Sequence, residues 1–307
     1  MAGLAAGVLT AVIAQGAQQP PSPVITFKAG VDLVRISAVV RDRKGRFVAD
    51  LTAHDFEVLD AGRPQRIADF RADLAGVSAA LLFDVSGSME ARLPGAREAA
   101  GQVLSWLTSD ADEAAVFTFD THLDEAVPFT SGLRVLPPSM ASVVPFGATS
   151  LFDAIAATAR KVAARQGLRR AVVVLTDGND NASRLTPSEV SGLASAVDVP
   201  VYVIATVPPI DNPADDIAVS GQASLPIGRL SDFAEWTGGH VFVASTPAER
   251  SAAARQIVDE LRHQYLLAFE STGAAGWHPL VVRARGKDLV VRTRSGYFAG
   301  QSRPDTR

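Results

Sequence analysis

Hydrophobic and polar residues alternate along the first part of the chain, a pattern typical of strands that bury one face. Residues 31–40 alternate in this way and are rich in β-branched side chains. Residues 42–45 have the composition of a hairpin turn, and residues 56–59 form a second strand-like run that ends in a turn at 60–62. We therefore expect residues 31–75 to form a small β unit.

From residue 77 onward, short apolar runs alternate with segments of helical periodicity. This alternation indicates a doubly wound α/β fold, in which helices cover both faces of a mostly parallel sheet. The expected core strands are residues 79–83, 113–119, 171–175, 199–205 and 241–244, with residues 122–128 as an edge strand beside the second of them.

Helical periodicity is clearest at residues 89–107 and 151–163. Pro94 lies inside the first pattern, and because proline suits a first helical turn but not a helix interior, we expect the regular helix to begin close to it. Two further helices are expected to begin after Thr186 and after Thr246. Each threonine is followed by proline and then by glutamate in capping-box order.

Residues 208–228 form a long connection without clear periodicity. The connection contains Asp211, Asp215 and Asp216, which invite interpretation as a cation site. Because these aspartates lack the regular alternation of a calcium-binding loop, we interpret the segment as a solvated loop.

The chain returns to a strand-like pattern at residues 265–269, 280–284 and 289–292. The simplest arrangement joins the N-terminal and C-terminal β segments into one sandwich-like unit, with the α/β domain inserted between them. The predicted organisation is a signal peptide (1–17), a linker (18–30), an N-terminal β segment (31–75), the α/β domain (76–264), a C-terminal β segment (265–299) and a tail (300–307).

Residues 1–17 carry no charged side chain and consist mainly of an apolar run followed by small residues. This composition predicts a secretory signal peptide cleaved near Gly16 or Ala17, and hence a protein exported to the periplasm, the cell surface or the medium. A membrane anchor is the alternative. The apolar run is, however, shorter than the ~20 residues that a spanning helix needs.

The overall composition is that of a globular protein, with 47% hydrophobic and 20% charged residues. A net charge of -4 offers no general attraction to phosphate backbones, which argues against a nucleic-acid partner. The sequence lacks the glycine-rich phosphate-binding patterns of nucleotide-binding proteins. It also has no cysteine, so disulfides and thiolate metal sites are excluded.

Polar side chains follow two of the expected core strands at the point where each strand ends. Asp84, Ser86 and Ser88 come directly after the first strand, and Asp177 comes after the third. In a parallel sheet, the loops at the carboxyl ends of the strands share one edge, where ligands bind. We therefore expect these two acidic turns to face the same crevice.

Together with Thr149, these residues offer only hard oxygen ligands, namely two carboxylates and three hydroxyls. Such a set suits Mg²⁺, Mn²⁺ or Ca²⁺ rather than zinc or copper. Because two carboxylates leave a divalent cation near neutral charge, the metal would still attract an outside anion. The Asp or Glu carboxylate of a protein partner could complete its coordination shell.

Three motifs resemble the metal-ion-dependent adhesion site of von Willebrand factor A domains. They are Asp84-x-Ser86-x-Ser88, the Gly147-Ala-Thr149 turn before a helix, and Thr176-Asp177-Gly178. The resemblance covers roughly residues 77–264, and it implies a Rossmann-like fold that holds a divalent metal. It further implies that the three hydroxyls coordinate directly or switch with state, while the two carboxylates act directly or through water.

The resemblance is looser in two places. The turn before Thr149 reads Phe146-Gly-Ala, where such domains often have two glycines, and this difference affects the path of the loop. Outside the domain, residues 34–40, the Asp55-Phe56 pair and the closing Arg294-Ser-Gly-Tyr297 resemble a bacterial group of exported von Willebrand factor A related proteins, in which β segments bracket the metal domain.

These motifs favour a protein-binding module that uses the metal to capture a partner carboxylate, and no catalysis is expected. A serine hydrolase is excluded because Ser86 lacks the Gly-x-Ser-x-Gly elbow. A metal-dependent hydrolase or phosphatase is the first alternative, with Arg92 and Arg184 as the nearest basic side chains. A structural scaffold with a non-functional metal site is the second.

Other acidic residues lie near these motifs in the sequence, namely Glu90, Asp120, Asp153 and Asp180. Glu90, Asp153 and Asp180 could support the metal ligands from behind, but we interpret them as solvent-facing or helix-capping residues, and Asp120 as a turn residue. Since Asp84 ends a strand instead of occupying the core, we expect Asp84→Ala to remove metal binding with little loss of fold.

Overall fold

The computed structural model describes residues 32–72, 76–165, 169–196, 198–206, 225–271 and 275–299. All described residues belong to one compact unit of the chain, Asp32–Arg307. The predicted signal peptide, linker and tail lie outside the described residues. So do Asp211, Asp215 and Asp216 of the long connection.

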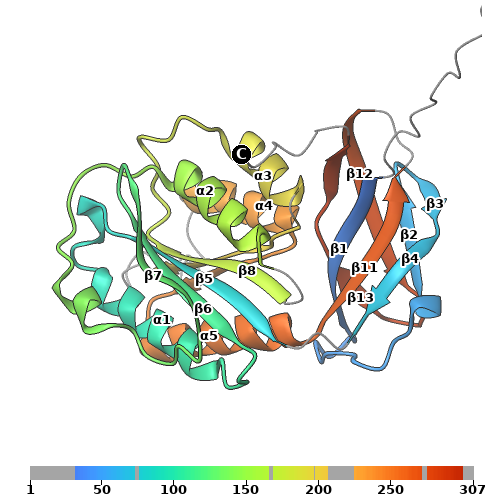
Figure 1. Cartoon of the computed structure of the whole chain (residues 1–307), viewed down its shortest axis with the longest axis horizontal. Helices are drawn as coiled ribbons and strands as arrows, with labels where there is room; N and C mark the ends of the chain where they lie inside the picture. Colours follow the sequence, from blue (N-terminus) through green and yellow to red (C-terminus); the bar gives the residue numbers. More distant parts are fainter. Residues whose placement is uncertain are drawn as a thin grey trace, which may run out of the picture. The chain divides into compact units, whose positions relative to one another are not determined.

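A six-stranded sheet lies at the centre of the α/β part of the chain, with the strand order β10-β9-β8-β5-β6-β7 (Figure 1). Its strands are β5 (Val77–Asp84), β6 (Glu113–Phe119), β7 (Leu123–Ser131), β8 (Arg169–Thr176), β9 (Val201–Thr206) and β10 (Val241–Ala244). All neighbours are parallel except β7, which pairs antiparallel with β6. Every residue of β5 and β9 is buried, as expected for strands covered on both faces. The predicted mostly parallel sheet and its edge strand are confirmed.

Helices cover both faces of this sheet (Figure 1). They are α1 (Leu93–Trp106), α2 (Leu151–Ala163), α3 (Pro187–Ala196), α4 (Leu225–Thr237) and α5 (Pro247–Arg262), with the short 3-10 helices η1 (Ala53–Asp55), η2 (Gly87–Met89) and η3 (Pro138–Ser142). Helices α1 and α5 pack with Leu81 and Phe83 of β5, whereas α2, α3 and α4 pack with Leu82. Successive side chains of β5 thus enter two separate cores, which confirms the doubly wound arrangement. Among the described residues, no helix is long and apolar enough to cross a membrane.

The helix starts follow local signals in the sequence. Pro94 lies in the first turn of α1, where the missing N–H costs no hydrogen bond. At the start of α5, the Thr246 hydroxyl accepts a hydrogen bond from the Glu249 N–H at 3.3 Å, and the Glu249 carboxylate accepts one from the Thr246 N–H at 2.9 Å. The same reciprocal bonds join Thr186 and Glu189 ahead of α3. Both predicted capping boxes are therefore confirmed.

The segments that flank the α/β part form two four-stranded antiparallel sheets around a shared core, here called the β sandwich. The strand orders are β13-β1-β11-β4 and β14-β12-β2-β3. The strands are β1 (Asp32–Arg41), β2 (Phe56–Asp60), β3 (Arg63–Gln65), β4 (Ile67–Arg71), β11 (Gln264–Ser271), β12 (Gly276–Ala284), β13 (Val290–Arg292) and β14 (Gly296–Ala299). Because β1 pairs with β11 along its length, the N-terminal and C-terminal flanks meet in one β unit, as the sequence predicts.

Three short strands of the β sandwich, β3, β4 and β14, are not predicted by the sequence pattern. β3 contains Pro64 and β14 begins at Gly296, both residues of low strand propensity. Each short strand is held by a longer neighbour: β3 by β2, β4 by β11 and β14 by β12. Pairing with a longer neighbour, rather than the composition of the short strand itself, therefore forms them.

Two charged clusters join the β sandwich to the α/β part of the same unit. Glu260 of α5 is fully buried and pairs with Arg41 of β1 at 2.8 Å and with Arg292 of β13. Asp198 accepts hydrogen bonds from the backbone N–H and the hydroxyl of Ser37, both at 3.2 Å. These contacts hold β1 and β13 against the end of α5 and the residues that precede β9.

Candidate metal centre

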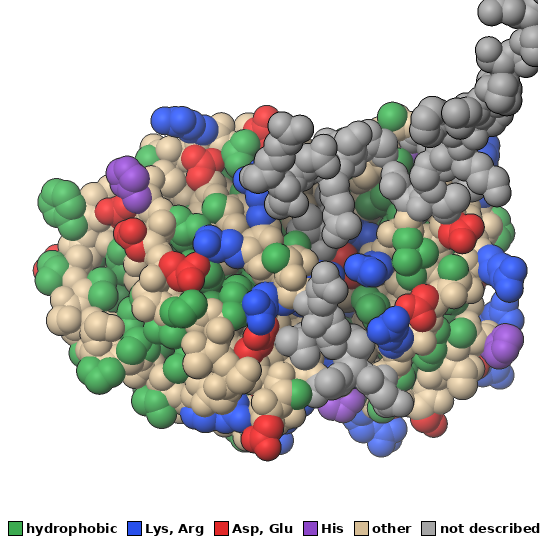
Figure 2. Space-filling model, viewed as in Figure 1, with side chains coloured by type: hydrophobic (Ala, Val, Ile, Leu, Met, Phe, Trp, Pro, Cys, Tyr) green, Lys and Arg blue, Asp and Glu red, His purple; other side chains and the backbone are tan. Residues whose placement is uncertain are grey.

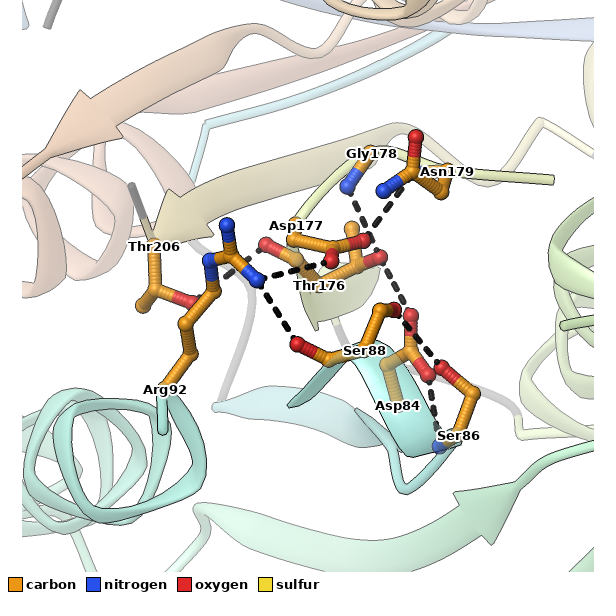
Figure 3. Close-up of polar contacts among 9 residues, drawn as sticks. All are labelled: Asp84, Ser86, Ser88, Arg92, Thr176, Asp177, Gly178, Asn179 and Thr206. Atoms are coloured by element: carbon orange, nitrogen blue, oxygen red, sulfur yellow. Dashed lines mark hydrogen bonds and ion pairs between the residues drawn. The ribbon is translucent and has the colours of Figure 1, made fainter. Parts of the chain in front are cut away.

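Two acidic turns lie at the carboxyl edge of the central sheet. Asp84 is the last residue of β5, and Asp177 directly follows β8, the strand that pairs with β5. Figure 3 shows the side chains of Asp84, Ser86 and Ser88 beside the turn that carries Asp177. The structure thus places both predicted carboxylates at one edge of the sheet, as the parallel topology requires.

The carboxylate of Asp84 is fully buried and hydrogen-bonded. One oxygen accepts from the Ser86 N–H at 3.0 Å, and the other accepts from the Thr176 hydroxyl at 2.6 Å. Burial raises the pKa of Asp84 to about 6; the hydrogen bonds from Ser86 and Thr176 oppose this shift, and the negative charge of Asp177 adds to it. An ionised Asp84 is therefore poorly compensated by the protein alone, and a nearby cation would stabilise it.

The two serine hydroxyls of the first motif lie 3.2 Å apart, Ser86 being buried and Ser88 exposed. The N-terminal residues of η2 supply this turn, which leaves the sheet directly after Asp84. The Ser86 hydroxyl is thus close to the buried carboxylate, while the Ser88 hydroxyl faces solvent, where an outside ligand would approach.

The loop that carries Thr149 is hydrogen-bonded to the turn that follows Asp84. The Gly87 N–H donates to the Gly147 carbonyl at 3.1 Å, and the Phe146 N–H donates to the Val85 carbonyl at 2.9 Å. Gly147 has a φ of +84°, a left-handed conformation that favours glycine, so the single glycine at this position satisfies the backbone requirement of the loop. Thr149 itself is buried.

Polar residues near the motifs hold these loops in place. The Asn181 side-chain oxygen accepts from the Thr149 N–H at 2.8 Å, and Asp180 accepts from the Leu151 N–H at 2.9 Å at the start of α2. Asp153 accepts from the backbone N–H groups of two residues in the loop before α3. Asp180 thus caps the start of α2, as expected, whereas Asp153 binds the backbone of a neighbouring loop instead of capping a helix. Asn181 belongs to none of the motifs identified in the sequence, so its role was not predicted.

Arg92, which directly precedes α1, also reaches this site (Figure 3). One of its terminal nitrogens donates to the Ser88 carbonyl at 2.7 Å and to the Asp177 carboxylate at 3.3 Å. The sequence suggests Arg92 only as a basic group for a phosphatase. Its position four residues after Ser88, across a helical turn, is the signal that could have placed it beside the carboxylates.

The sequence-based expectation for Asp84→Ala needs correction in its structural part. Although Asp84 ends a strand, its side chain is fully buried and accepts two hydrogen bonds. Alanine would leave the Thr176 hydroxyl and the Ser86 N–H without their acceptor, at a cost of about 1–3 kcal/mol for each buried group left unsatisfied. Asparagine keeps the shape and one acceptor oxygen, so it is the better test of the carboxylate.

The donor chemistry fits a hard divalent cation. Two carboxylates and three hydroxyls come from three loops that hydrogen bonds join at one edge of the sheet. Within the described part of the chain, no group of three or more His, Cys, Asp or Glu side chains could hold a metal. A cation at this edge would therefore depend on the serine and threonine hydroxyls as well as on Asp84 and Asp177.

Comparison with known proteins gives a family match over part of the chain. Residues 79–179 match the family model of the von Willebrand factor type A domain. This segment contains all three motifs of the candidate metal centre. No curated protein matches the chain.

Several solved structures are similar to this one. An aerotolerance-related membrane protein from Bacteroides fragilis is 20% identical, with a TM-score of 0.48, over 61% of this chain and 98% of that protein. BatB from Bacteroides thetaiotaomicron is 21% identical, with a TM-score of 0.46, over 60% of this chain and 98% of that protein. A von Willebrand factor type A protein from Catenulispora acidiphila is 13% identical, with a TM-score of 0.48, and covers 89% of this chain and 76% of its own.

Proposed function

We propose that this chain, which carries a von Willebrand factor type A domain, is a non-enzymatic protein-binding module that uses a divalent cation to capture a partner's carboxylate. Asp84, Ser86, Ser88, Thr149 and Asp177 would hold Mg²⁺, or Mn²⁺ or Ca²⁺ in its place. The observation that carries the proposal is the buried Asp84 carboxylate, facing a second carboxylate at the edge of the sheet where three loops are hydrogen-bonded together.

Charge balance explains why such a site would bind a partner. Two carboxylates neutralise a divalent cation, and hydroxyl ligands add no further negative charge. A cation held in this way keeps its attraction for another carboxylate, and the exposed Ser88 marks the side from which it would arrive. An Asp or Glu side chain on a protein surface has the chemistry to complete the shell.

A metal-dependent hydrolase or phosphatase would need an activated nucleophile, and we find little to favour one. In the described part of the chain, the Ser86 and Ser88 hydroxyls are hydrogen-bonded to each other and to no histidine or lysine. One terminal nitrogen of Arg92 already donates to the Ser88 carbonyl and to the Asp177 carboxylate within the protein. A binding role therefore remains our proposal.

Calorimetric titration of Mg²⁺ into the metal-free protein tests the proposed site directly. We expect one saturable site for each chain, with Mn²⁺ competing for it. If neither cation binds at millimolar concentration, the proposal is wrong.

The charge of Arg92 should weaken metal binding. Its guanidinium contacts Asp177, so it already neutralises part of the negative charge that would attract a cation. We expect Arg92→Gln to raise the affinity for Mg²⁺ by about tenfold. The substitution removes a positive charge beside the cation, and the repulsion between the two costs at least about 1 kcal/mol. Calorimetry of this variant beside Arg255→Gln, a change at an exposed arginine of α5, provides the comparison. An unchanged or weaker affinity in Arg92→Gln would show that Arg92 does not oppose the cation.

Export is the second part of the proposal, and the apolar, uncharged residues 1–17 support it. We expect the mature chain to begin near Ala17 or Gln18. N-terminal sequencing of protein recovered from the periplasm or the medium checks this expectation. Recovery of exported material that still begins with Met1 would overturn it.

A further inference from the structure

We infer that the partner presents a bulky apolar side chain next to its acidic residue, and that Phe146 receives this apolar side chain. The inference rests on the proposed function and adds to it the chemical class of the partner's motif. The Phe146 side chain is an aromatic ring that packs into none of the hydrophobic cores of the described chain.

Phe146 and Val144 lie in the loop before α2, and both are 80% exposed. Side chains of this type are usually buried, because removing their apolar surface from water is favourable. In Figure 2, hydrophobic side chains protrude at the left edge of the molecule, over the loops that precede α2 in Figure 1. The Phe146 ring therefore offers apolar surface that the described part of the chain leaves exposed.

Hydrogen bonds hold the backbone beneath this ring on both sides. The Phe146 N–H donates to the Val85 carbonyl at 2.9 Å, and the next residue, Gly147, accepts from the Gly87 N–H at 3.1 Å. Earlier in the loop, the Val143 carbonyl accepts from Arg97 of α1 at 2.9 Å. An exposed ring on a fixed backbone loses little conformational freedom when a partner covers it, which is the property of an interface anchor.

The same hydrogen bonds place the backbone that carries this ring beside the turn of the candidate metal centre. Val85 and Gly87 flank Ser86 in the turn that follows Asp84, so the Phe146 backbone contacts the metal-binding turn itself. Charge complementarity then selects the occupant. A bound cation attracts a carboxylate, so the segment that reaches Phe146 is the one that carries this acidic residue.

A panel of short synthetic peptides tests the inference. Each peptide has one central Asp, flanked either by Leu and Phe or by Ser and Gly, and is titrated against the full chain in Mg²⁺ and in EDTA. We expect the apolar-flanked peptides to bind the wild-type protein at least about tenfold more tightly, since covering an aromatic anchor is worth this much or more. Phe146→Ser should lose the preference, and Phe146→Leu should keep part of it.

The controls separate this inference from the proposed function. Val290→Thr changes another exposed apolar residue, on β13 of the β sandwich, and should leave the peptide preference as in the wild type. Phe146→Ser should bind Mn²⁺ with unchanged affinity. Magnesium-dependent binding without an apolar preference would overturn the Phe146 inference alone, whereas peptide binding that persists in EDTA would overturn the proposed function as well. If Phe146→Ser converted a dimer into a monomer in sedimentation experiments, the occupant would be a second copy of this chain, and the inference would be wrong.

Discussion

Asp84→Asn should abolish the binding of Mg²⁺ and Mn²⁺ while the protein stays folded. The change removes one of the two carboxylates at the site, which we expect to weaken metal binding by about a hundredfold or more. It keeps a side-chain oxygen to accept from the Thr176 hydroxyl or the Ser86 N–H. Burial already disfavours the ionised form of Asp84, whose pKa is about 6, and the neutral amide relieves that cost. The one donor that loses its acceptor costs about 1–3 kcal/mol in the free energy of unfolding, so we expect at most a modest loss of stability in the metal-free protein.

Electron paramagnetic resonance of Mn²⁺ measures the bound fraction, and thermal unfolding in EDTA measures stability. The matched control is Asp120→Asn, which makes the same change at the end of the adjacent strand β6, where Asp120 accepts from the His122 N–H in a turn. This control should bind Mn²⁺ like the wild type. If Asp84→Asn bound Mn²⁺ equally well, Asp84 would not be part of a metal site.

Glu260→Ala should be the most destabilising single change at the junction of the β sandwich and the α/β part. Glu260 is fully buried, whereas its partners Arg41 and Arg292 each expose 27% of their side chains. Alanine would leave both guanidinium groups without a carboxylate in a largely desolvated setting. Breaking a buried ion pair in this way costs about 3–5 kcal/mol in the free energy of unfolding.

Urea unfolding of Glu260→Ala beside Glu98→Ala checks this expectation. Glu98 pairs with Arg250 at 2.6 Å, but its side chain is 39% exposed, so its loss should cost less than about 1 kcal/mol. Equal midpoints for the two variants would mean that the buried cluster contributes no more than a surface ion pair. The junction would then have to be held by other contacts, such as those of Asp198 with Ser37.

Much of the fold could be predicted because its signals are local. The strands of the central sheet are continuous apolar runs, since β5 and β9 are buried along their whole length. The starts of α3 and α5 are marked by threonine, proline and glutamate in fixed order. The short strands β3 and β14 were not predicted, because pairing with the longer neighbours β2 and β12, rather than their own composition, holds Pro64 and Gly296 in extended conformation.

The residues of the candidate metal centre could also be named from the sequence, because each follows a strand or precedes a helix in a recognisable motif. Their surroundings could not. The spacing of Arg92 from Ser88 points it toward the Ser88 turn, but the sequence does not reveal that it contacts Asp177, or that Asn181 holds the backbone of Thr149. Both contacts join residues from different loops, and only the folded arrangement of the strands brings them together. The same is true of the bonds that fix Phe146 against Val85.

The most direct test of the central claim is partner capture from native envelope or secreted extract, with the wild-type chain and Asp84→Asn each immobilised in Mg²⁺ and in EDTA. Our account predicts a protein that the wild type retains in Mg²⁺, that EDTA releases, and that Asp84→Asn fails to retain. Equal capture of that protein in EDTA, or by Asp84→Asn in Mg²⁺, would contradict the claim that a metal at this site mediates binding.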